Sequence, residues 1–356
     1  MSTESMANGN GAGMEISFSG QNEQIDPLID QLIGLVGDVC HPAMVREMIL
    51  TVLKAGRESR DRAGLKLMTS TLKELRYTAK VFEQYRGVRK VTIFGSARVM
   101  PDSGSYQLAK SLASTLAQCG YMVITGGGQG IMRAGNEGAG EKHSFAVNIR
   151  LPFEDGGNNI MHGSPRSITY KYFFNRKVAF IKEADAVALF AGGFGTLDEA
   201  MEVLTLVQTG KRYPIPLILV DQPEGTYWSN WKSYVERELL ARGYINSEDL
   251  SLFTMVDSVK DAVEVINRFY YRYHSLRFFA NRLVIRLQST VDAENISRWK
   301  KEFSDILEPG GNFCLSQALP EEEDEPEIFH LPRLILDFNR KYFSRLRQLI
   351  DAINRA

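Results

Sequence analysis

The chain has 356 residues, of which 44% are apolar and 24% charged, and its formal net charge is -1. This composition is ordinary for a folded protein with a core, and the length predicts a main domain with flanking pieces. A net charge so close to zero excludes a general attraction to nucleic acid or to an anionic membrane, so any polyanion must bind at a local site. No apolar stretch approaches the ~20 residues of a membrane-spanning helix. The three cysteines form no CxxC pair, which favours a reducing cytoplasm over a disulfide framework or a zinc site.

The first part of the chain divides into a polar stretch and a helical stretch. Residues 1–24 are rich in Gly, Ser and Asn, which predicts a disordered leader and no signal peptide. Apolar residues at helical spacing follow over 25–54, with an interruption at Pro42, and again over 62–86. We therefore expect a helical N-terminal region over 25–87, whose apolar stripe serves packing or an interface.

From residue 88 onward, short β-branched runs that end in glycine alternate with helical segments. The predicted strands are 91–95, 121–127, 145–151, 186–192 and 216–221. The predicted helices are 104–118, 130–142, 171–183 and 196–209. Apolar strands separated by helices of this length predict an α/β fold with a doubly wound, Rossmann-like parallel sheet. Such sheets bind ligands at the carboxyl ends of their strands, where the glycines of this chain stand.

The rest of the chain is expected to complete this domain and to add a small extension. Helices expected around 228–242 and 258–275 complete a nucleotide-binding domain over 88–275. Residues 276–356 then form an α+β C-terminal extension, in which two strands flank a helix. Its acidic segment "PEEEDEPE" is expected to be a solvated linker.

Two basic stretches near the end of the chain could suggest a nucleic-acid partner. The terminal stretch from Leu331 is expected to be a basic amphipathic helix, and two uses stay open: packing on another subunit or domain, or docking on a polyanion. The segment "RFYYRYH" (268–274) has the aromatic and basic residues that stack on bases. Because it continues a helical pattern, we favour packing and expect no nucleic-acid partner.

Three glycine-rich stretches stand at the ends of predicted strands: "FGSAR" (94–98), "TGGGQGIM" (125–132) and "AGGFGTLDE" (191–199). Glycine allows the backbone to approach a ligand closely, and a helix that begins directly afterwards directs free N–H groups and its positive dipole end to the same point. One such loop is weak evidence because a tight turn needs glycine anyway. Three loops in one sheet favour a site for an anion or a nucleotide.

The spacing of these glycines argues against a dinucleotide. The G-x-G-x-x-G pattern fails because Ile131, Arg133 or Asp198 stands where its third glycine is required. No Lys-Ser/Thr pair follows the glycines, so a Walker A loop is excluded as well. The pattern predicts a phosphate cradle without dinucleotide geometry.

Charged residues near these stretches suggest which chemistry could take place beside a bound phosphate. Arg176 can fork onto a phosphate or a ribose hydroxyl and Lys177 adds a point charge, although both also suit a solvated helix surface. Glu199 and Glu202 are three residues apart and share a helix face, whereas Asp198 is expected to point elsewhere. A carboxylate one turn beyond a phosphate loop lies about a sugar's length from the phosphate, which suits chemistry at a ribose.

In order and spacing, these motifs resemble the Lonely Guy (LOG) family, whose members were long mislabelled lysine decarboxylases. The resemblance covers roughly residues 88–270 and is closest to the longer bacterial members. It implies a doubly wound fold, a homodimer or larger assembly, and hydrolysis of the N-glycosidic bond of a nucleoside 5′-monophosphate, such as AMP or a cytokinin nucleotide. The products are the free base and ribose 5-phosphate. No cofactor or metal is implied.

The resemblance also assigns roles to residues by their position. It implies Arg176 and Glu199 as the catalytic pair. The phosphate and nucleotide cradle would consist of Gly95, Ser96, Gly126, Gly127, Gly128, Gly192, Gly193, Gly195 and Thr196, with Lys177 beside them.

The sequence departs from the family pattern at two positions. Ala191 and Gln129 stand where the family usually has proline, and the loss of proline can loosen a loop. The alternative interpretation is therefore a nucleotide-binding regulatory protein with little or no hydrolysis. An NAD(P) oxidoreductase is disfavoured by the failed glycine spacing.

Overall fold

The computed structural model describes residues 25–151 and 157–356. The leader expected over 1–24 lies outside the described residues. The described chain forms two compact units, one reaching Ser70 and one over Thr71–Ala356. The first contains α1 (Asp26–Val36), α2 (Pro42–Glu58) and the beginning of α3 (Arg62–Glu83), with the predicted break at Pro42, which stands at the first position of α2. The domain boundaries at 87 and 275 stay predictions.

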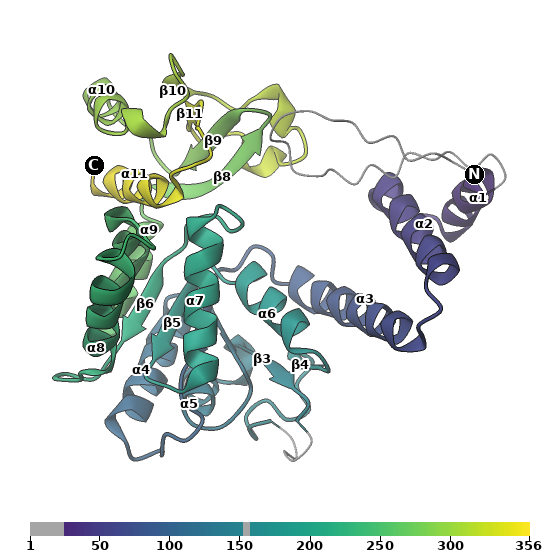
Figure 1. The fold of residues 1–356 in the computed structure, drawn as a ribbon, viewed down its shortest axis with the longest axis horizontal. Coiled ribbons are helices and arrows are strands. Elements are labelled where there is room, and N and C mark those ends of the chain that lie inside the picture. Colours follow the sequence, from purple (N-terminus) through teal and green to yellow (C-terminus); the bar gives the residue numbers. More distant parts are fainter. Residues whose placement is uncertain (1–24, 152–156) are drawn as a thin grey trace. The chain divides into compact units, whose positions relative to one another are not determined.

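The second unit is built on a seven-stranded parallel sheet with the order β4-β3-β2-β1-β5-β6-β7, which confirms the predicted α/β fold (Figure 1). Its strands are β1 (Lys90–Phe94), β2 (Met122–Thr125), β3 (Ser144–Ile149), β4 (Ser167–Tyr170), β5 (Ala186–Phe190), β6 (Leu217–Val220) and β7 (Phe253–Val256). The chain winds outward from β1 to β4 and then returns to place β5 on the other side of β1. The point where the winding reverses, between β1 and β5, is where sheets of this kind bind ligands.

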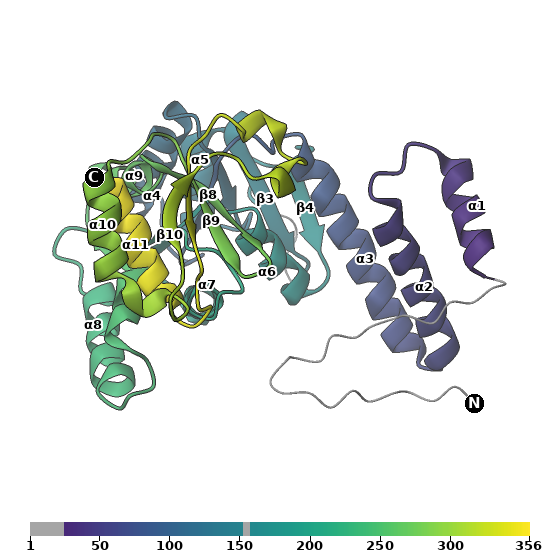
Figure 2. The same cartoon turned by 90° about the horizontal axis from the view of Figure 1, so that it is seen from above.

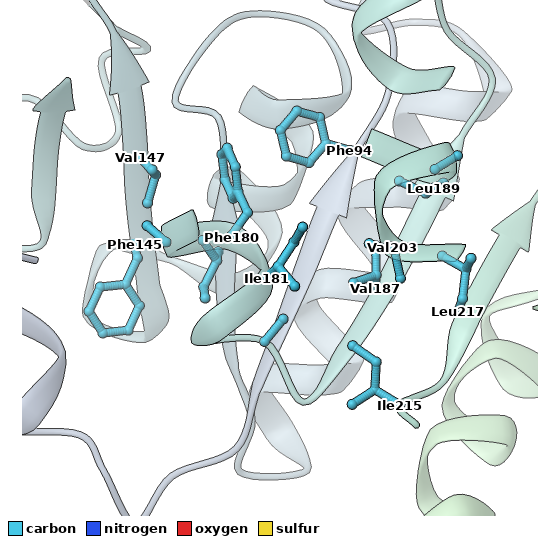
Figure 3. Packing of buried hydrophobic residues seen from close by; sticks show 14 of the residues in the cluster. Phe94, Phe145, Val147, Phe180, Ile181, Val187, Leu189, Val203, Ile215 and Leu217 are labelled. Carbon is cyan, nitrogen blue, oxygen red and sulfur yellow. The ribbon is translucent and has the colours of Figure 1, made fainter. Parts of the chain in front are cut away.

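Helices cover both faces of this sheet (Figures 1 and 2). Their bounds are α4 (Gly104–Gln118), α5 (Ile131–Ala139), α6 (Phe173–Lys182), α7 (Phe194–Gln208), α8 (Tyr227–Tyr234) and α9 (Val259–Phe269). The end of α3 packs with α6, α7 and α8 on one face, and α4, α5 and α9 pack on the other. Figure 3 shows part of the first core, where Phe94 of β1 packs edge-to-face on Phe180 of α6 with ring centroids 4.6 Å apart.

The sequence analysis missed the two edge strands, β4 and β7. The predicted strands β1, β5 and β6 are buried throughout, whereas β4 and β7 each include exposed and half-buried residues. Because an edge strand has a neighbour on one side only, it needs no continuous apolar run, and that run was the signal used.

The C-terminal extension contains a second, antiparallel sheet with the order β10-β11-β9-β8. Its elements are β8 (Tyr273–Phe279), β9 (Arg282–Leu287), α10 (Ala293–Glu302), β10 (Phe313–Ser316), β11 (Arg333–Leu336) and α11 (Phe343–Arg355). The predicted terminal helix is therefore correct only from Phe343, because the stretch before it pairs as β11. Helix α11 packs on α7, α9 and β8 of the same chain, which confirms packing as its use.

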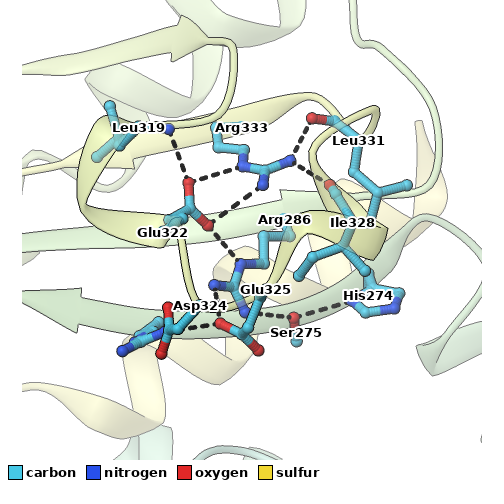
Figure 4. A network of polar contacts seen from close by, with 11 residues as sticks. His274, Ser275, Arg286, Leu319, Glu322, Asp324, Glu325, Ile328, Leu331 and Arg333 are labelled. Atoms are coloured by element: carbon cyan, nitrogen blue, oxygen red, sulfur yellow. Dashed lines mark hydrogen bonds and ion pairs between the residues drawn. The ribbon is translucent and has the colours of Figure 1, made fainter. Parts of the chain in front are cut away.

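The expected solvated acidic linker is wrong at Glu322, which is completely buried. Arg286 of β9 and Arg333 of β11 are direct cross-strand partners and are also buried. Glu322 binds both guanidinium groups, with 2.8 Å from its Oε1 to Arg286 Nε and 3.0 Å from its Oε2 to Arg333 Nε, and Glu325 adds a second carboxylate to Arg286 (Figure 4). The acidic segment thus neutralises two arginines that would otherwise be buried side by side without a counter-charge.

The helix expected over 258–275 ends earlier, at Phe269. "RFYYRYH" therefore spans the end of α9 and the start of β8, not a continuous helix. Three of its four aromatic side chains pack as expected, since Phe269 and Tyr273 are buried and Tyr270 donates to the Asp185 carbonyl at 2.6 Å, whereas Tyr271 is exposed. Within the described residues, no helix has the length and apolar character to cross a membrane.

Candidate active site

The three glycine stretches meet at the carboxyl ends of β1, β2 and β5. The Ser96 N–H, after β1, donates to the Ala191 carbonyl after β5 at 3.1 Å. The Ile131 N–H, at the start of α5, donates to the Ser96 carbonyl, also at 3.1 Å. Since these loops come from three separate parts of the sequence, their contact at the reversal point of the sheet defines the candidate site.

Two of the glycines are required by this close approach. A Cβ on Gly192 would lie 2.1 Å from Thr196 Oγ1 and 2.9 Å from Ser96 N. A Cβ on Gly95 would lie 2.7 Å from the Ile131 side chain. A larger residue at either position would separate the loops.

The second loop, Gly126 to Gly128, is held by a buried polar network. Asn158 donates its backbone N–H to the Gly127 carbonyl at 2.6 Å and its side-chain amide to the Gly128 carbonyl at 3.2 Å. Asn136 lies beneath and accepts hydrogen bonds from Thr125 at 2.7 Å and from Asn158 at 2.9 Å. The sequence analysis missed Asn158 because it belongs to no motif and lies more than 25 residues along the chain from the loop it holds.

The third loop leads directly into α7, for which Gly193 is the N-cap residue. Among the residues that the structure describes, the backbone N–H groups of Gly193, Phe194 and Gly195 have no hydrogen-bond acceptor. Unpaired N–H groups at a helix start, with the positive end of the helix dipole, are suited to bind an anion. Phe194 points into solvent with 93% of its surface exposed.

Lys177 of α6 contacts three carboxylates of α7. Its Nζ lies 2.8 Å from Asp198, 2.6 Å from Glu202 and 3.9 Å from Glu199. The expectation that Asp198 points elsewhere is wrong, because Asp198 and Glu202 are four residues apart and therefore share a face of the helix. With these partners, Lys177 holds α6 against α7 beside the loop, and its role in phosphate binding stays a prediction.

Glu199 is 4% exposed, and its environment changes its titration. Burial raises its pKa to about 7, although Lys177 and Arg176 act in the opposite direction. A carboxyl group with a pKa near neutrality can hold or release a proton at physiological pH, which suits a catalytic acid or base.

Arg176 lies near enough to Glu199 for their charges to interact, but no hydrogen bond joins the two side chains. Its guanidinium carbon is 5.1 Å from the ring centroid of Phe173 and 5.4 Å from that of Phe180. Burial lowers the pKa of Arg176, and the charges of Glu199 and Asp198 oppose this. Its Nε is buried and has no partner among the described residues, so the group is free to bind a substrate oxygen.

Two cavities lie away from these loops. A groove of about 800 Å³ is lined by α4 and α9, including Thr115 and Val263. A polar pocket of about 280 Å³ is lined by Gln208, Asp249 and Ser344, among others. Neither includes a residue of the three glycine stretches, so the candidate site is defined by its loops and charged groups.

The family described as "possible lysine decarboxylase" matches residues 128–266 of this chain, which include α6, β5 and the loop into α7. Among curated relatives, the cytokinin riboside 5′-monophosphate phosphoribohydrolase LOG3 of Arabidopsis thaliana is 24% identical over 187 residues, which are 51% of this chain and 83% of that protein. A probable enzyme of the same name, LOGL5 of Oryza sativa subsp. japonica, is 34% identical over 124 residues, which are 33% of this chain and 49% of that protein.

A solved structure, the molybdenum cofactor binding protein of Rippkaea orientalis, is also similar. It is 18% identical, with a TM-score of 0.36, and the match covers 51% of this chain and 94% of that one.

Proposed function

We infer that this chain, a member of the Lonely Guy family by its motifs and by the match over residues 128–266, hydrolyses the N-glycosidic bond of a nucleoside 5′-monophosphate. The products would be the free base and ribose 5-phosphate. The observation that supports this most directly is the placement of buried Glu199 one helical turn after the unpaired N–H groups of Gly193, Phe194 and Gly195.

The phosphate of the substrate would bind at the start of α7. The N–H groups there supply hydrogen bonds and the helix dipole supplies partial positive charge, so neither a metal nor a dinucleotide fold is needed for this step. From that anchor, the ribose would extend toward Glu199 and Arg176, and the base would lie beyond the ribose.

Cleavage of the glycosidic bond builds positive charge on the ring oxygen and C1′ of the ribose. Ionised Glu199 would stabilise that charge or take a proton from the attacking water, and protonated Glu199 could donate a proton to the departing base. Arg176, with a free Nε, would fix the substrate through a phosphate or hydroxyl oxygen.

The proposal is tested by incubating the purified protein with AMP, GMP, CMP and a cytokinin riboside 5′-monophosphate and separating any free base by chromatography. We expect release from at least one substrate, and a loss of at least about a hundredfold in Glu199→Gln. Glu236→Gln, at a half-buried glutamate of the segment after α8, serves as the matched control and should keep the wild-type rate. No base from any substrate at high enzyme concentration would refute the hydrolase, and AMP that binds but stays intact would favour the regulatory alternative.

A location in the cytoplasm and a homo-oligomer also stay proposals. Phe174 and Val178 support the homo-oligomer, because these apolar residues share one face of α6 and are 48% and 47% exposed, as residues of an interface between subunits would be in a single chain. Light scattering should then give a mass above the 40.1 kDa of one chain, and Val178→Asp should lower it. A single-chain mass for the wild type would contradict the assembly.

A further inference from the structure

Three consecutive carbonyl groups of the loop between β5 and α7 each accept a hydrogen bond. The Ala191 carbonyl accepts from Ser96 N–H, and the Gly193 carbonyl accepts from the N–H groups of Thr196 and Leu197 in the first turn of α7. The Gly192 carbonyl, between them, accepts from the Tyr227 hydroxyl at 2.7 Å. The donor to the middle carbonyl, Tyr227, thus belongs neither to the loop that contains Ser96 nor to α7, which supply the other donors.

The direction of a carbonyl group determines the direction of the next N–H. Because a trans peptide is planar, the carbonyl of Gly192 and the N–H of Gly193 point in opposite directions. While the Tyr227 hydroxyl holds that carbonyl, the Gly193 N–H faces away from Tyr227, and no described residue accepts it. Two flanking glycines would otherwise let this peptide group rotate at little cost.

Tyr227 is itself firmly placed, at the first position of α8. Asp221, directly after β6, accepts hydrogen bonds from the N–H groups of Tyr227 at 3.0 Å and Trp228 at 3.3 Å. The Tyr227 ring packs edge-to-face on buried Trp228, with centroids 4.8 Å apart. These contacts fix the position of the Tyr227 side chain, and with it the position of the hydroxyl at the loop.

We propose that Tyr227 is a positioning residue: its hydroxyl orients the Gly192–Gly193 peptide so that the Gly193 N–H is presented to the substrate phosphate. This inference rests on the proposed function of the loop. It also explains how the loop keeps its shape with Ala191 in place of the family's proline. Proline would stiffen the chain covalently, whereas here Tyr227 and Ser96 hold two successive carbonyls.

The test compares Tyr227→Phe with Tyr270→Phe. Each substitution removes one tyrosine hydroxyl that donates to a backbone carbonyl beside β5. The Tyr227 bond is to Gly192 after the strand at 2.7 Å, and the Tyr270 bond is to Asp185 before it at 2.6 Å. The two variants should lose a similar amount of thermal stability. A difference in ligand binding between them therefore comes from the place of the lost hydrogen bond and not from a less stable fold. The probes are ribose 5-phosphate and AMP, with dissociation constants from calorimetry and KM and kcat from base release.

For Tyr227→Phe we expect a five- to tenfold weaker binding of ribose 5-phosphate and a similar rise in KM for AMP, with kcat changed less than about twofold. Tyr270→Phe should keep the wild-type values. If wild-type protein binds ribose 5-phosphate and Tyr227→Phe binds it equally well, the positioning role is refuted while the proposed function stands. If the wild type binds neither ribose 5-phosphate nor any of the four nucleoside monophosphates tested for base release, the phosphate site itself is refuted and both proposals fail.

Discussion

Replacement of Glu199 by glutamine should stabilise the protein at alkaline pH while it removes activity. The folded state raises the pKa of Glu199 to about 7 from an ordinary value of 4.5, mainly by burial. The proton therefore stabilises the fold fully below pH 4.5, and this contribution is lost as the pH rises through 7. Glutamine has the same shape and no charge to bury, so the variant avoids that loss.

The size of the effect follows from the pKa values. One pKa unit corresponds to about 1.4 kcal/mol, so ionised Glu199 costs the folded state about 3 kcal/mol well above pH 7. At about pH 5.5, Glu199 is largely protonated in the folded protein and the cost falls to about 1.4 kcal/mol. The stability gained by Glu199→Gln should thus be about 2 kcal/mol larger at about pH 8.5 than at about pH 5.5. Lys177 keeps Asp198 and Glu202 as partners in the variant, so no charge is left unpaired.

Urea unfolding of the wild type and Glu199→Gln at both pH values measures this difference directly. Glu202→Gln, on the same helix face and 31% exposed in its side chain, is the matched control. It should show no such pH-dependent gain, since a partly exposed ion pair is worth only about 0–1 kcal/mol. An equal shift of the urea midpoint at both pH values for Glu199→Gln would show that Glu199 titrates normally, and the mechanistic role given to it here would lose its physical basis.

Two further predictions concern the acidic segment and the glycine loop. Glu322→Gln should destabilise the protein by about 3–5 kcal/mol in urea unfolding, because it leaves Arg286 and Arg333 buried with too little negative charge. Exposed Glu323→Gln should change stability by less than about 0.5 kcal/mol, and equal effects of the two would contradict a buried network. Gly192→Ala should weaken AMP binding at least tenfold in calorimetry, because its Cβ would force Thr196 and Ser96 apart. Gly87→Ala, with open space around its Cβ, should bind as the wild type does, and unchanged binding in Gly192→Ala would show that the loops tolerate separation.

Much of this protein follows from local sequence patterns. Buried parallel strands are continuous apolar runs, so β1, β5 and β6 were predicted to within two residues at each end, and glycines at their ends marked the edge that binds ligands. The family resemblance likewise rests on residues close in sequence, and the match over 128–266 confirms it. These features depend on the spacing of apolar residues along the chain and on the conformations that single residues allow, and both can be read from a sequence.

Other features depended on which segments meet, and only the tertiary structure decided them. The composition of its segment predicts a solvated Glu322, yet in the folded chain this carboxylate is the counter-charge of two buried arginines from paired strands. The pKa of Glu199 depends on burial and on the charges of Lys177 and Arg176 from α6, and Tyr227 reaches Gly192 across 35 residues. Burial, charge pairing and hydrogen bonds between distant segments are properties of the packed chain, so no local pattern could have predicted them.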